Sequence, residues 1–211
     1  MSFHQTDWTV LLIAGPSGAG KTILAKQIGL RFGVSWLEVD DLRLALQRSR
    51  VMLPERTEAL YFFEETQHVW RMPAERLCDG LIAVGQVMAP ALEVVIENHV
   101  DNAAPVVIEG DGILPSLFAR PPVRDRAAGG HVQAVFLIEP EEGAIFANMM
   151  ARNRGIAERT EAELRTEAHA KWLFGRWLAD EASRYGLPVV EPRPWLTLLE
   201  RVMMAVNASS L

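Results

Sequence analysis

The stretch Gly15-Pro16-Ser17-Gly18-Ala19-Gly20-Lys21-Thr22 decides the fold, because it matches the phosphate-binding pattern G-x-x-x-x-G-K-[ST] at every fixed position. The apolar run at residues 10–14 precedes it and is typical of a buried parallel strand. Residues 22–32 follow it and can form a helix. A strand, a glycine-rich loop and a helix in this order predict a P-loop, for which the alternative is an ordinary glycine-rich turn.

The residue types of this loop suit a polyphosphate. Gly15, Gly18 and Gly20 lack a Cβ, so the backbone can wrap closely around phosphate groups and point several N–H groups at them. The Lys21 ammonium would reach the β- and γ-phosphates, and the Thr22 hydroxyl would ligate a magnesium ion. The residues predicted to bind the nucleotide from this loop are Gly15, Ser17, Gly18, Ala19, Gly20, Lys21 and Thr22.

Length and composition are those of a globular protein. A chain of 211 residues can form one large α/β domain, residues 1–211, with an inserted lid or substrate-binding segment. Its residues are 49% hydrophobic and 23% charged, and it has no low-complexity stretch or internal repeat. The net charge of −6 argues against a nucleic-acid partner, which requires a basic surface.

Several features indicate a reducing, aqueous compartment. The only cysteine, Cys78, cannot form an internal disulfide and is expected to be a buried or half-buried inert thiol. The N-terminus lacks the pattern of a signal peptide, and no uninterrupted apolar run approaches the ~18 residues of a membrane span. We therefore expect a cytoplasmic protein without a membrane partner.

Short apolar runs predict four further strands, at residues 35–39, 105–109, 132–138 and 187–190. Five strands that alternate with helices predict a parallel sheet with right-handed crossovers and helices on both faces. The fold class is therefore α/β, the three-layer sandwich of P-loop nucleotide-binding proteins. We expect the strand at 35–39 to lie next to the P-loop strand.

Helical spacing and turn residues define the elements between the second and fourth strands. Residues 42–50 and 57–71 are expected to be helices, and Pro73 opens a long helical stretch that Pro90 should kink or interrupt. Residues 120–130 are rich in proline and glycine and are expected to be a loop.

The region 52–102 is larger than a connection between two parallel strands requires. It is a candidate wall for an acceptor pocket. A purely structural connection is the alternative.

Three helices are expected after the fourth strand. The first covers residues 140–153, and the second begins at a capping box formed by Thr160 and Glu163 and ends near Tyr185. The last helix is expected to bury a face with helical spacing, consisting of Leu196, Leu199, Met203 and Val206.

Acidic residues follow two of the predicted strands. Asp40 and Asp41 come after the strand at 35–39, and Glu109 and Asp111 come at the end of the strand at 105–109. Ligands of an open parallel sheet bind outside the carboxyl ends of its strands. We therefore expect these acids to lie near the P-loop.

The chain resembles the P-loop small-molecule kinases, and among them 2-phosphoglycerate kinase and its relatives. The likeness spans about residues 10–206, and only the P-loop is highly specific. It rests on Gly15 to Thr22, on Val39-Asp40-Asp41-Leu42-Arg43, and on Val107-Ile108-Glu109-Gly110 followed by Ile113-Leu114-Pro115. Asp111 departs from the pattern of these relatives, which more often have an apolar residue there, and the acceptor can differ accordingly.

The resemblance implies ATP and Mg²⁺ as cofactors and transfer of the γ-phosphoryl group to a small, anionic, hydroxyl-bearing acceptor. Thr22 and Glu109 would hold the magnesium ion, and Lys21 would act on the donor phosphates. Asp40 would accept a proton from the acceptor hydroxyl or orient it, and the alternative is that Asp40 or Asp41 caps the following helix.

Further residues are candidates for binding the acceptor or for a lid. Arg43 is a candidate to bind an acidic acceptor, and the alternative is a solvated helix face. Asp111 is a second candidate acceptor-binding residue or base, and the alternative is a turn former between two glycines. The lid would span 152–160, where Arg152 and Arg154 would act in catalysis and Arg152 would also contact the nucleotide.

Two classes of function are compatible with these motifs. The first is an ATP-dependent kinase, and the second is an ATP-binding regulatory module or switch that hydrolyses ATP slowly or not at all. The chain has neither the N-K-x-D motif of GTPases nor an L-S-G-G-Q-like signature of transport ATPases. The acids at Asp40 and Glu109 favour catalysis, while the acceptor and the oligomeric state stay open.

Overall fold

A five-stranded parallel sheet forms the centre of the protein. The structure is a computed structural model that describes residues 6–53, 56–152 and 159–208. The strand order is β2-β3-β1-β4-β5, and each neighbouring pair is parallel. The strands are β1 (Val10–Ala14), β2 (Ser35–Glu38), β3 (Val106–Gly110), β4 (Val132–Leu137) and β5 (Val189–Val190).

The predicted parallel sheet is confirmed, but the expected position of the second strand is wrong. β3 lies between β2 and the P-loop strand β1. The reason is hydrophobic burial: every residue of β3 is buried, whereas Ser35 and Trp36 of β2 are exposed. A continuous apolar strand belongs in the middle of a parallel sheet, and a partly polar strand can lie at its edge.

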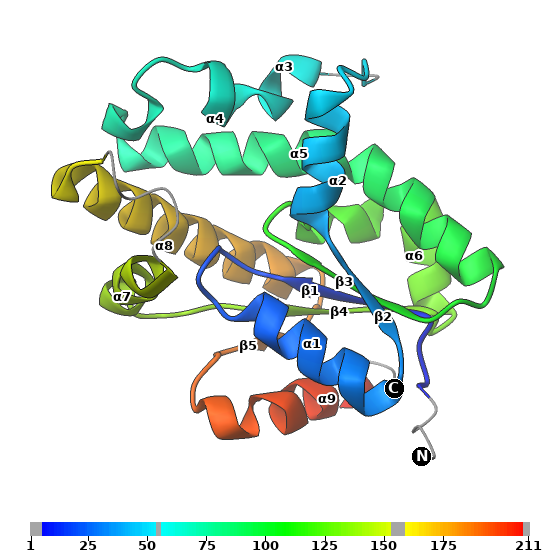
Figure 1. Ribbon diagram of the computed structural model, residues 1–211. Helices are drawn as coiled ribbons and strands as arrows, with labels where there is room; N and C mark the ends of the chain where they lie inside the picture. Colours follow the sequence, from blue (N-terminus) through cyan, green and yellow to red (C-terminus); the bar gives the residue numbers. More distant parts are fainter. Residues whose placement is uncertain (1–5, 54–55, 153–158, 209–211) are drawn as a thin grey trace.

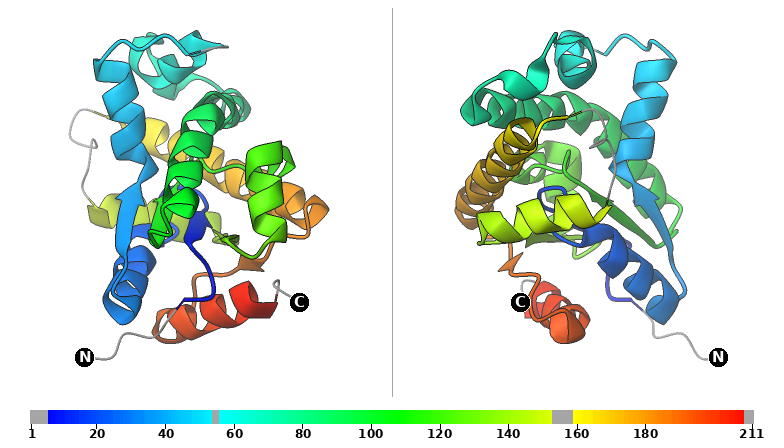
Figure 2. Two further views of the ribbon diagram at one scale, coloured as in Figure 1. Left: turned by 90° about the vertical axis from the view of Figure 1, so that its right-hand side faces the viewer. Right: turned by 60° about the vertical axis from the view of Figure 1, so that its left-hand side comes forward.

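Helices cover both faces of the sheet (Figure 1). α1 and α9 lie on one face, and α5, α6 and α8 lie on the other, as the side views also show (Figure 2). The helices are α1 (Lys21–Phe32), α2 (Val39–Arg48), α3 (Thr57–Leu60), α4 (Phe62–Glu65), α5 (Ala74–Asp101), α6 (Pro121–Ala128), α7 (Glu142–Arg152), α8 (Glu161–Arg184) and α9 (Leu198–Ala208), with the 3₁₀ turns η1 (Val69–Arg71), η2 (Pro115–Ala119) and η3 (Trp195–Thr197).

β1 joins the two hydrophobic cores because its side chains alternate between the faces. Val10 and Leu12 pack with the core under α5 and α8, while Leu11 and Ile13 pack with the core under α1 and α9. All five residues of β1 are fully buried. The P-loop therefore begins at the most completely buried strand of the sheet.

Two expected boundaries between β2 and β4 are wrong. Residues 57–71 form α3, α4 and η1 rather than one helix, and His68 adopts a left-handed conformation with φ of 51° that a helix does not allow. Residues 121–128 form α6 where a loop is expected. Proline is well suited to the first turn of a helix, so Pro121 begins α6 rather than preventing it.

The expected inward face of the last helix is confirmed except for Leu196. Leu196 precedes α9 in the turn η3 and is 97% exposed. Val206 is fully buried as expected, and Leu199 and Met203 are partly buried against the same core. Leu198 and Val202 complete this face. α9 begins at Leu198, so Leu196 lies outside the helix and does not share its inward face.

The second helix after β4 begins as expected. The Thr160 hydroxyl accepts a hydrogen bond of 3.2 Å from the Glu163 backbone N–H, and the Thr160 N–H donates one of 2.9 Å to the Glu163 carboxylate. This reciprocal capping box stabilises the start of α8. Glu163 also pairs with Arg71 of η1 at 2.8 Å, so the start of α8 is attached to the segment before α5.

α5 runs through Pro90 without a break and bends along its course (Figure 1). Among the residues that the structure describes, it is also the one helix long and apolar enough to cross a membrane by length and composition alone. Met88, Leu92 and Ile96 on its inner face are fully buried in the main core. A core helix of this kind passes the same test of length and composition.

Cys78 lies on α5, and its side chain is buried, as the sequence predicts. Burial raises the pKa of the Cys78 thiol to about 11, with smaller contributions from the charges of Asp79 and Glu75. A thiol of this pKa is almost entirely protonated near neutral pH. It is therefore a poor nucleophile, because the thiolate is the reactive form.

We predict that iodoacetamide modifies Cys78 slowly in the native protein. At pH 8 only about a thousandth of a thiol with this pKa is ionised, so alkylation should be about a hundredfold or more slower than in denaturing urea. Mass spectrometry over time measures both rates. Because Cys78 is the only cysteine, Cys78→Ser gives the background, and equal rates in the two conditions would contradict the burial described here.

Candidate active site

The P-loop connects β1 to α1 and makes close contacts that only glycine permits. Gly15 has φ of 138°, and a Cβ on it would lie 2.1 Å from the Leu137 carbonyl oxygen. Gly20 precedes α1 with φ of 88°, and a Cβ there would lie 2.3 Å from the ring of Trp195. Both ends of the loop are thus fixed in left-handed conformations against neighbouring elements.

Lys21 is buried at the start of α1 and has two partners in the described structure. Its Nζ donates a hydrogen bond of 3.2 Å to the Pro16 carbonyl oxygen and lies 3.5 Å from the Asp111 carboxylate. The Asp111 contact crosses from the P-loop to the end of β3. These contacts keep the ammonium group at the mouth of the loop, where a phosphate would be bound.

Thr22 and Glu109 form a pair of oxygen ligands beside the loop. The Thr22 hydroxyl donates a hydrogen bond of 2.5 Å to the Glu109 carboxylate, which is buried on β3. Burial raises the pKa of Glu109, although Lys21 and Thr22 act in the opposite direction. The two residues come from different elements, so the tertiary structure brings the predicted magnesium ligands together.

The oxygen pair fits a magnesium ion that is shared with a nucleotide. Magnesium is usually held by one or two carboxylates together with waters and substrate phosphates, rather than by an all-protein cage. Within the described residues there is no group of three or more His, Cys, Asp or Glu side chains that could hold a metal by itself. Thr22 and Glu109 can therefore supply part of the coordination, and phosphate oxygens are needed for the rest.

We predict that Glu109→Gln weakens ATP binding only when magnesium is present. The amide keeps the shape of the side chain and can accept the Thr22 hydrogen bond, but it loses the anionic ligand. Affinity for Mg-ATP should fall by about tenfold or more, while affinity for ATP in EDTA should change little. Isothermal titration calorimetry measures both.

Glu200→Gln is the matched control, since Glu200 forms a surface ion pair with Arg31 on α1. It should bind as the wild type in both conditions. Equal loss of affinity with and without magnesium in Glu109→Gln would contradict a role in holding the metal.

The first turn of α2 places Asp40 over the same cavity. α2 begins at Val39 and not at Leu42, so Asp40 and Asp41 lie inside the helix rather than before it. No side-chain hydrogen bond caps α2, and capping by Asp40 or Asp41 is therefore not observed. Asp40 is 62% exposed and pairs with Arg43 at 3.2 Å, and Arg43 also donates to Gln47.

Asp111 follows β3 and faces the cavity between two lysines. Burial alone would raise the pKa of this carboxyl, but Lys21 and Lys171 outweigh it and hold the pKa below its ordinary value. Asp111 is therefore an anion that neutralises lysine charge. The alternative role of Asp111 as a turn former between two glycines does not account for its contact with Lys21.

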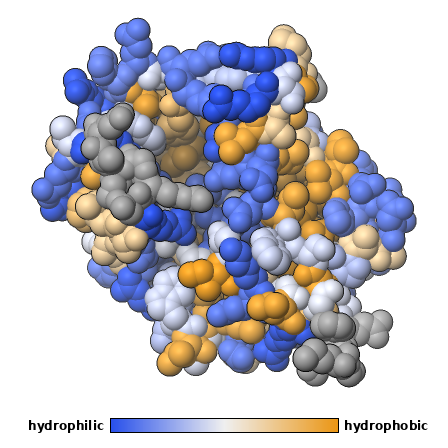
Figure 3. All heavy atoms as spheres, in the orientation of Figure 1, coloured by the Kyte–Doolittle hydropathy of each residue, from blue (hydrophilic) through white to orange (hydrophobic). Residues whose placement is uncertain are grey.

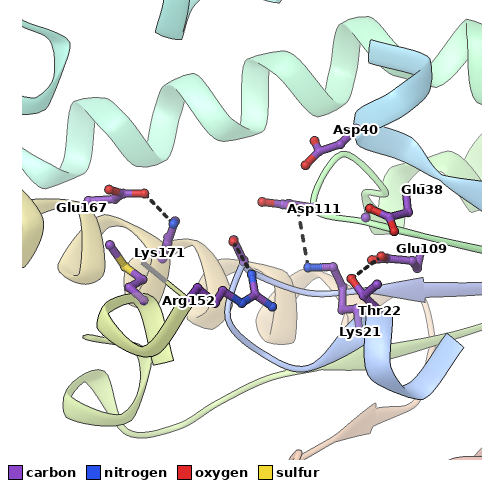
Figure 4. A pocket seen from close by; sticks show the side chains of 12 residues that line it. Lys21, Thr22, Glu38, Asp40, Glu109, Asp111, Arg152, Glu167 and Lys171 are labelled. Atoms are coloured by element: carbon purple, nitrogen blue, oxygen red, sulfur yellow. Dashed lines mark hydrogen bonds and ion pairs between the residues drawn. The ribbon is translucent and has the colours of Figure 1, made fainter. Parts of the chain in front are cut away.

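The cavity above the P-loop has a volume of about 240 Å³. Figure 4 shows the side chains of Lys21, Asp40 and Asp111 converging on it from α1, α2 and the end of β3. The polar side chains that line it are Ser17, Lys21, Thr22, Glu38, Asp40, Glu109, Asp111, Arg152, Glu167 and Lys171. Most of the predicted site residues thus lie around one cavity.

The predicted lid is described only in part. Arg152, at the end of α7, lies 3.3 Å from the Ser17 hydroxyl and lines the cavity. Asn148 on the same helix donates a hydrogen bond of 3.0 Å to the Gly18 carbonyl oxygen and attaches α7 to the P-loop. Arg154 lies outside the described residues, within 153–158, so its predicted catalytic role stays a prediction.

Glu167 and Lys171 line the cavity and were not predicted from the sequence. They lie one turn apart on α8, 2.5 Å from each other, and Arg159 also pairs with Glu167. Burial acts to raise the pKa of Glu167, but Lys171 and Arg159 hold it below its ordinary value. The sequence does contain a signal for them. Both charged residues occupy positions on the helix face formed by Leu164, Ala168 and Phe174, where apolar side chains are expected.

The protein has an α/β fold with a P-loop sequence between β1 and α1, and this fold matches the architecture of the shikimate kinase and gluconokinase structures. A shikimate kinase from Bacteroides thetaiotaomicron has a TM-score of 0.51 at 16% identity, with 94% of this chain and 98% of that chain covered. A shikimate kinase from Acinetobacter baumannii has a TM-score of 0.50 at 15% identity, with 97% of this chain and 96% of that chain covered. A gluconokinase from Sinorhizobium meliloti 1021 has a TM-score of 0.50 at 15% identity, with 98% of this chain and 95% of that chain covered.

These similarities concern the fold, and they extend over nearly the whole chain. They give no particular support to 2-phosphoglycerate kinase. No protein-family model matches the sequence, and no curated protein matches it. The activity must therefore be argued from the residues of the site.

Proposed function

We propose that the protein is an ATP-dependent phosphotransferase that moves the γ-phosphoryl group of Mg-ATP to a hydroxyl of a small metabolite. One observation carries the proposal: the P-loop lysine, the Thr22–Glu109 pair and the carboxylates of Asp40 and Asp111 line a single cavity. A protein that only binds ATP needs the first two features. Carboxylates beyond the phosphate site are what an acceptor hydroxyl requires.

The donor half of the site would hold the nucleotide. Backbone N–H groups of the P-loop and the Lys21 ammonium would bind the phosphates, and Arg152 would neutralise charge on the transferring group. Thr22 and Glu109 would hold magnesium, which supplies charge neutralisation at the phosphates when bound. The similar fold of the shikimate kinase and gluconokinase structures agrees with this arrangement.

In the acceptor half, Asp40 would orient the hydroxyl and take its proton. Asp40 is more suitable than Asp111, because Asp111 is paired with Lys21 and close to Lys171, which lower its pKa and hence its basicity. The region 52–102, in particular α4, η1 and α5, would form the wall of the acceptor site. Arg43, which pairs with Asp40, would hold that carboxylate in place.

Other features of the proposal come from the sequence alone. The resemblance to 2-phosphoglycerate kinase implies an anionic acceptor, and composition and charge imply a cytoplasmic protein without a nucleic-acid or membrane partner. The 211 residues would act as one domain whose lid at 152–160 closes over the nucleotide. These points stay predictions.

We predict that Asp40→Asn lowers phosphoryl transfer without weakening ATP binding. Positioned acid or base groups contribute about 10²–10⁴-fold in rate, whereas the donor phosphates are held by Lys21 and backbone amides. The measurement is single-turnover transfer from γ-labelled ATP to an acceptor found by screening small hydroxy compounds, with the affinity for Mg-ATP and the melting temperature measured alongside.

Asp41→Asn is the matched control, because Asp41 lies in the same first turn of α2 and does not line the cavity. It should transfer phosphate at the wild-type rate. A transfer rate of Asp40→Asn close to that of the wild type would mean that Asp40 has only a structural role. If the wild type binds Mg-ATP but transfers phosphate to no acceptor of the screen, the regulatory ATP-binding module is the better description.

A further inference from the structure

A second cavity adjoins the phosphate cavity on the side of α2 and α5. Its volume is about 250 Å³, and it shares Asp40, Asp111 and Lys171 with the first cavity. Figure 3 shows the surface hollowed between α2, α5 and α8, with apolar residues inside the hollow. A molecule in the second cavity would therefore contact the carboxylates of Asp40 and Asp111 from the side opposite to the nucleotide phosphates.

The wall of this second cavity is apolar. Six of its residues have hydrocarbon or aromatic side chains, and they come from α2, α4, η1 and α5: Val39, Phe63, Trp70, Leu81, Val84 and Met88. The rings of Phe63 and Trp70 are stacked, with centroids 5.5 Å apart and planes at 24°. An acceptor that is bound only through hydroxyls or phosphate groups would leave this wall without a partner.

Trp70 is fixed in place by Arg159, which precedes α8. The Arg159 guanidinium lies over its ring, 4.1 Å from the centroid, and the same guanidinium pairs with Glu167. Phe63 is held at its edge by Phe62, with centroids 4.9 Å apart. The two aromatic side chains of the wall thus form a supported surface rather than freely rotating groups.

The charged residues of the second cavity are already matched with one another. Arg43 pairs with Asp40 at 3.2 Å, and Lys171 pairs with Glu167 at 2.5 Å. Among the described residues that line the cavity, three are acids (Asp40, Asp111 and Glu167) and two are bases (Arg43 and Lys171). Asp111 pairs with Lys21, and Glu167 also pairs with Arg159, so each acid and each base of this cavity has a partner. An anionic acceptor would therefore have to break one of these pairs.

Resting on the proposed function, we propose that the acceptor is an alcohol with an apolar, ring-shaped body and no negative charge on that body. The ring would lie against Phe63 and Trp70, and the hydroxyl would reach Asp40. In the transfer, the hydroxyl oxygen bonds to the γ-phosphorus and the bond from that phosphorus to the ADP oxygen breaks. The hydroxyl proton passes to the Asp40 carboxylate. This substrate class differs from the anionic acceptor that the sequence resemblance implies.

The test compares two acceptors that share a ring and a reactive CH₂OH group. They are 1,4-benzenedimethanol, which is neutral, and 4-(hydroxymethyl)benzoate, which carries a carboxylate. D-glycerate represents a small anion without a ring. Binding of each to the protein saturated with a non-hydrolysable ATP analogue and magnesium is measured by calorimetry, and transfer from γ-labelled ATP is measured separately.

We expect the diol to bind about tenfold or more tightly than the benzoate, and glycerate to bind more weakly than the diol. Trp70→Ala should weaken diol binding on the order of tenfold, since stacked aromatic contacts and lost burial act together. Trp36→Ala is the matched control: Trp36 lies half-exposed on β2, outside both cavities, and this variant should bind the diol as the wild type does.

The wild-type comparison does not depend on any variant, so it stands even if Trp70→Ala fails to fold. Tighter binding of the benzoate or of glycerate, or no measurable binding of the diol, overturns the inference. Unchanged diol affinity in folded Trp70→Ala overturns it as well. Failure of the proposed function gives a different result, in which the diol binds in a Trp70-dependent manner but phosphate is transferred to no acceptor.

Discussion

The central position of β1 in the sheet is the constraint on which the site depends. β1 pairs with β3 on one side and with β4 on the other, so that Ile13 lies opposite Glu109 and Ala14 opposite Gly110. Parallel strands in this register end at the same level. The P-loop that leaves β1 therefore begins beside Glu109 and Asp111, and Thr22 of the following helix reaches the Glu109 carboxylate.

Charge compensation is the second principle of the site. Lys21, Arg43 and Lys171 each have a carboxylate partner, namely Asp111, Asp40 and Glu167. Lys21 and Glu167 are the buried members of these pairs, and pairing makes the burial of their charges acceptable. A phosphate group bound to Lys21 would compete with Asp111 for the ammonium group. Nucleotide binding would therefore change the charge that Asp111 presents to the second cavity.

The segment before and including α5 connects the second cavity to the cavity above the P-loop. η1 is attached to α8 through Arg71 and Glu163, and Trp70 of η1 contacts Arg159 just before α8. α8 in turn carries Glu167 and Lys171 into the cavity, and Arg152 of α7 contacts the P-loop residue Ser17. Arg152, before residues 153–158, thus contacts the P-loop, and Arg159, after them, contacts Trp70 in the wall of the second cavity.

The sequence by itself determined the parts of the protein that rest on local residue patterns. The P-loop, the five parallel strands, the capping box at Thr160 and the buried Cys78 all follow from spacing and residue type, because each pattern has one favourable local structure. The tertiary structure decided the rest. Strand order depended on how completely β3 is buried relative to β2, and the exposure of Leu196 depended on a helix that begins only at Leu198. The apolar wall of the second cavity became visible only there, since it joins residues of α2, α4, η1 and α5 whose contacts are set by packing between distant elements. The Glu167–Lys171 pair is local to α8, but only the packing of α8 shows that it faces the cavity.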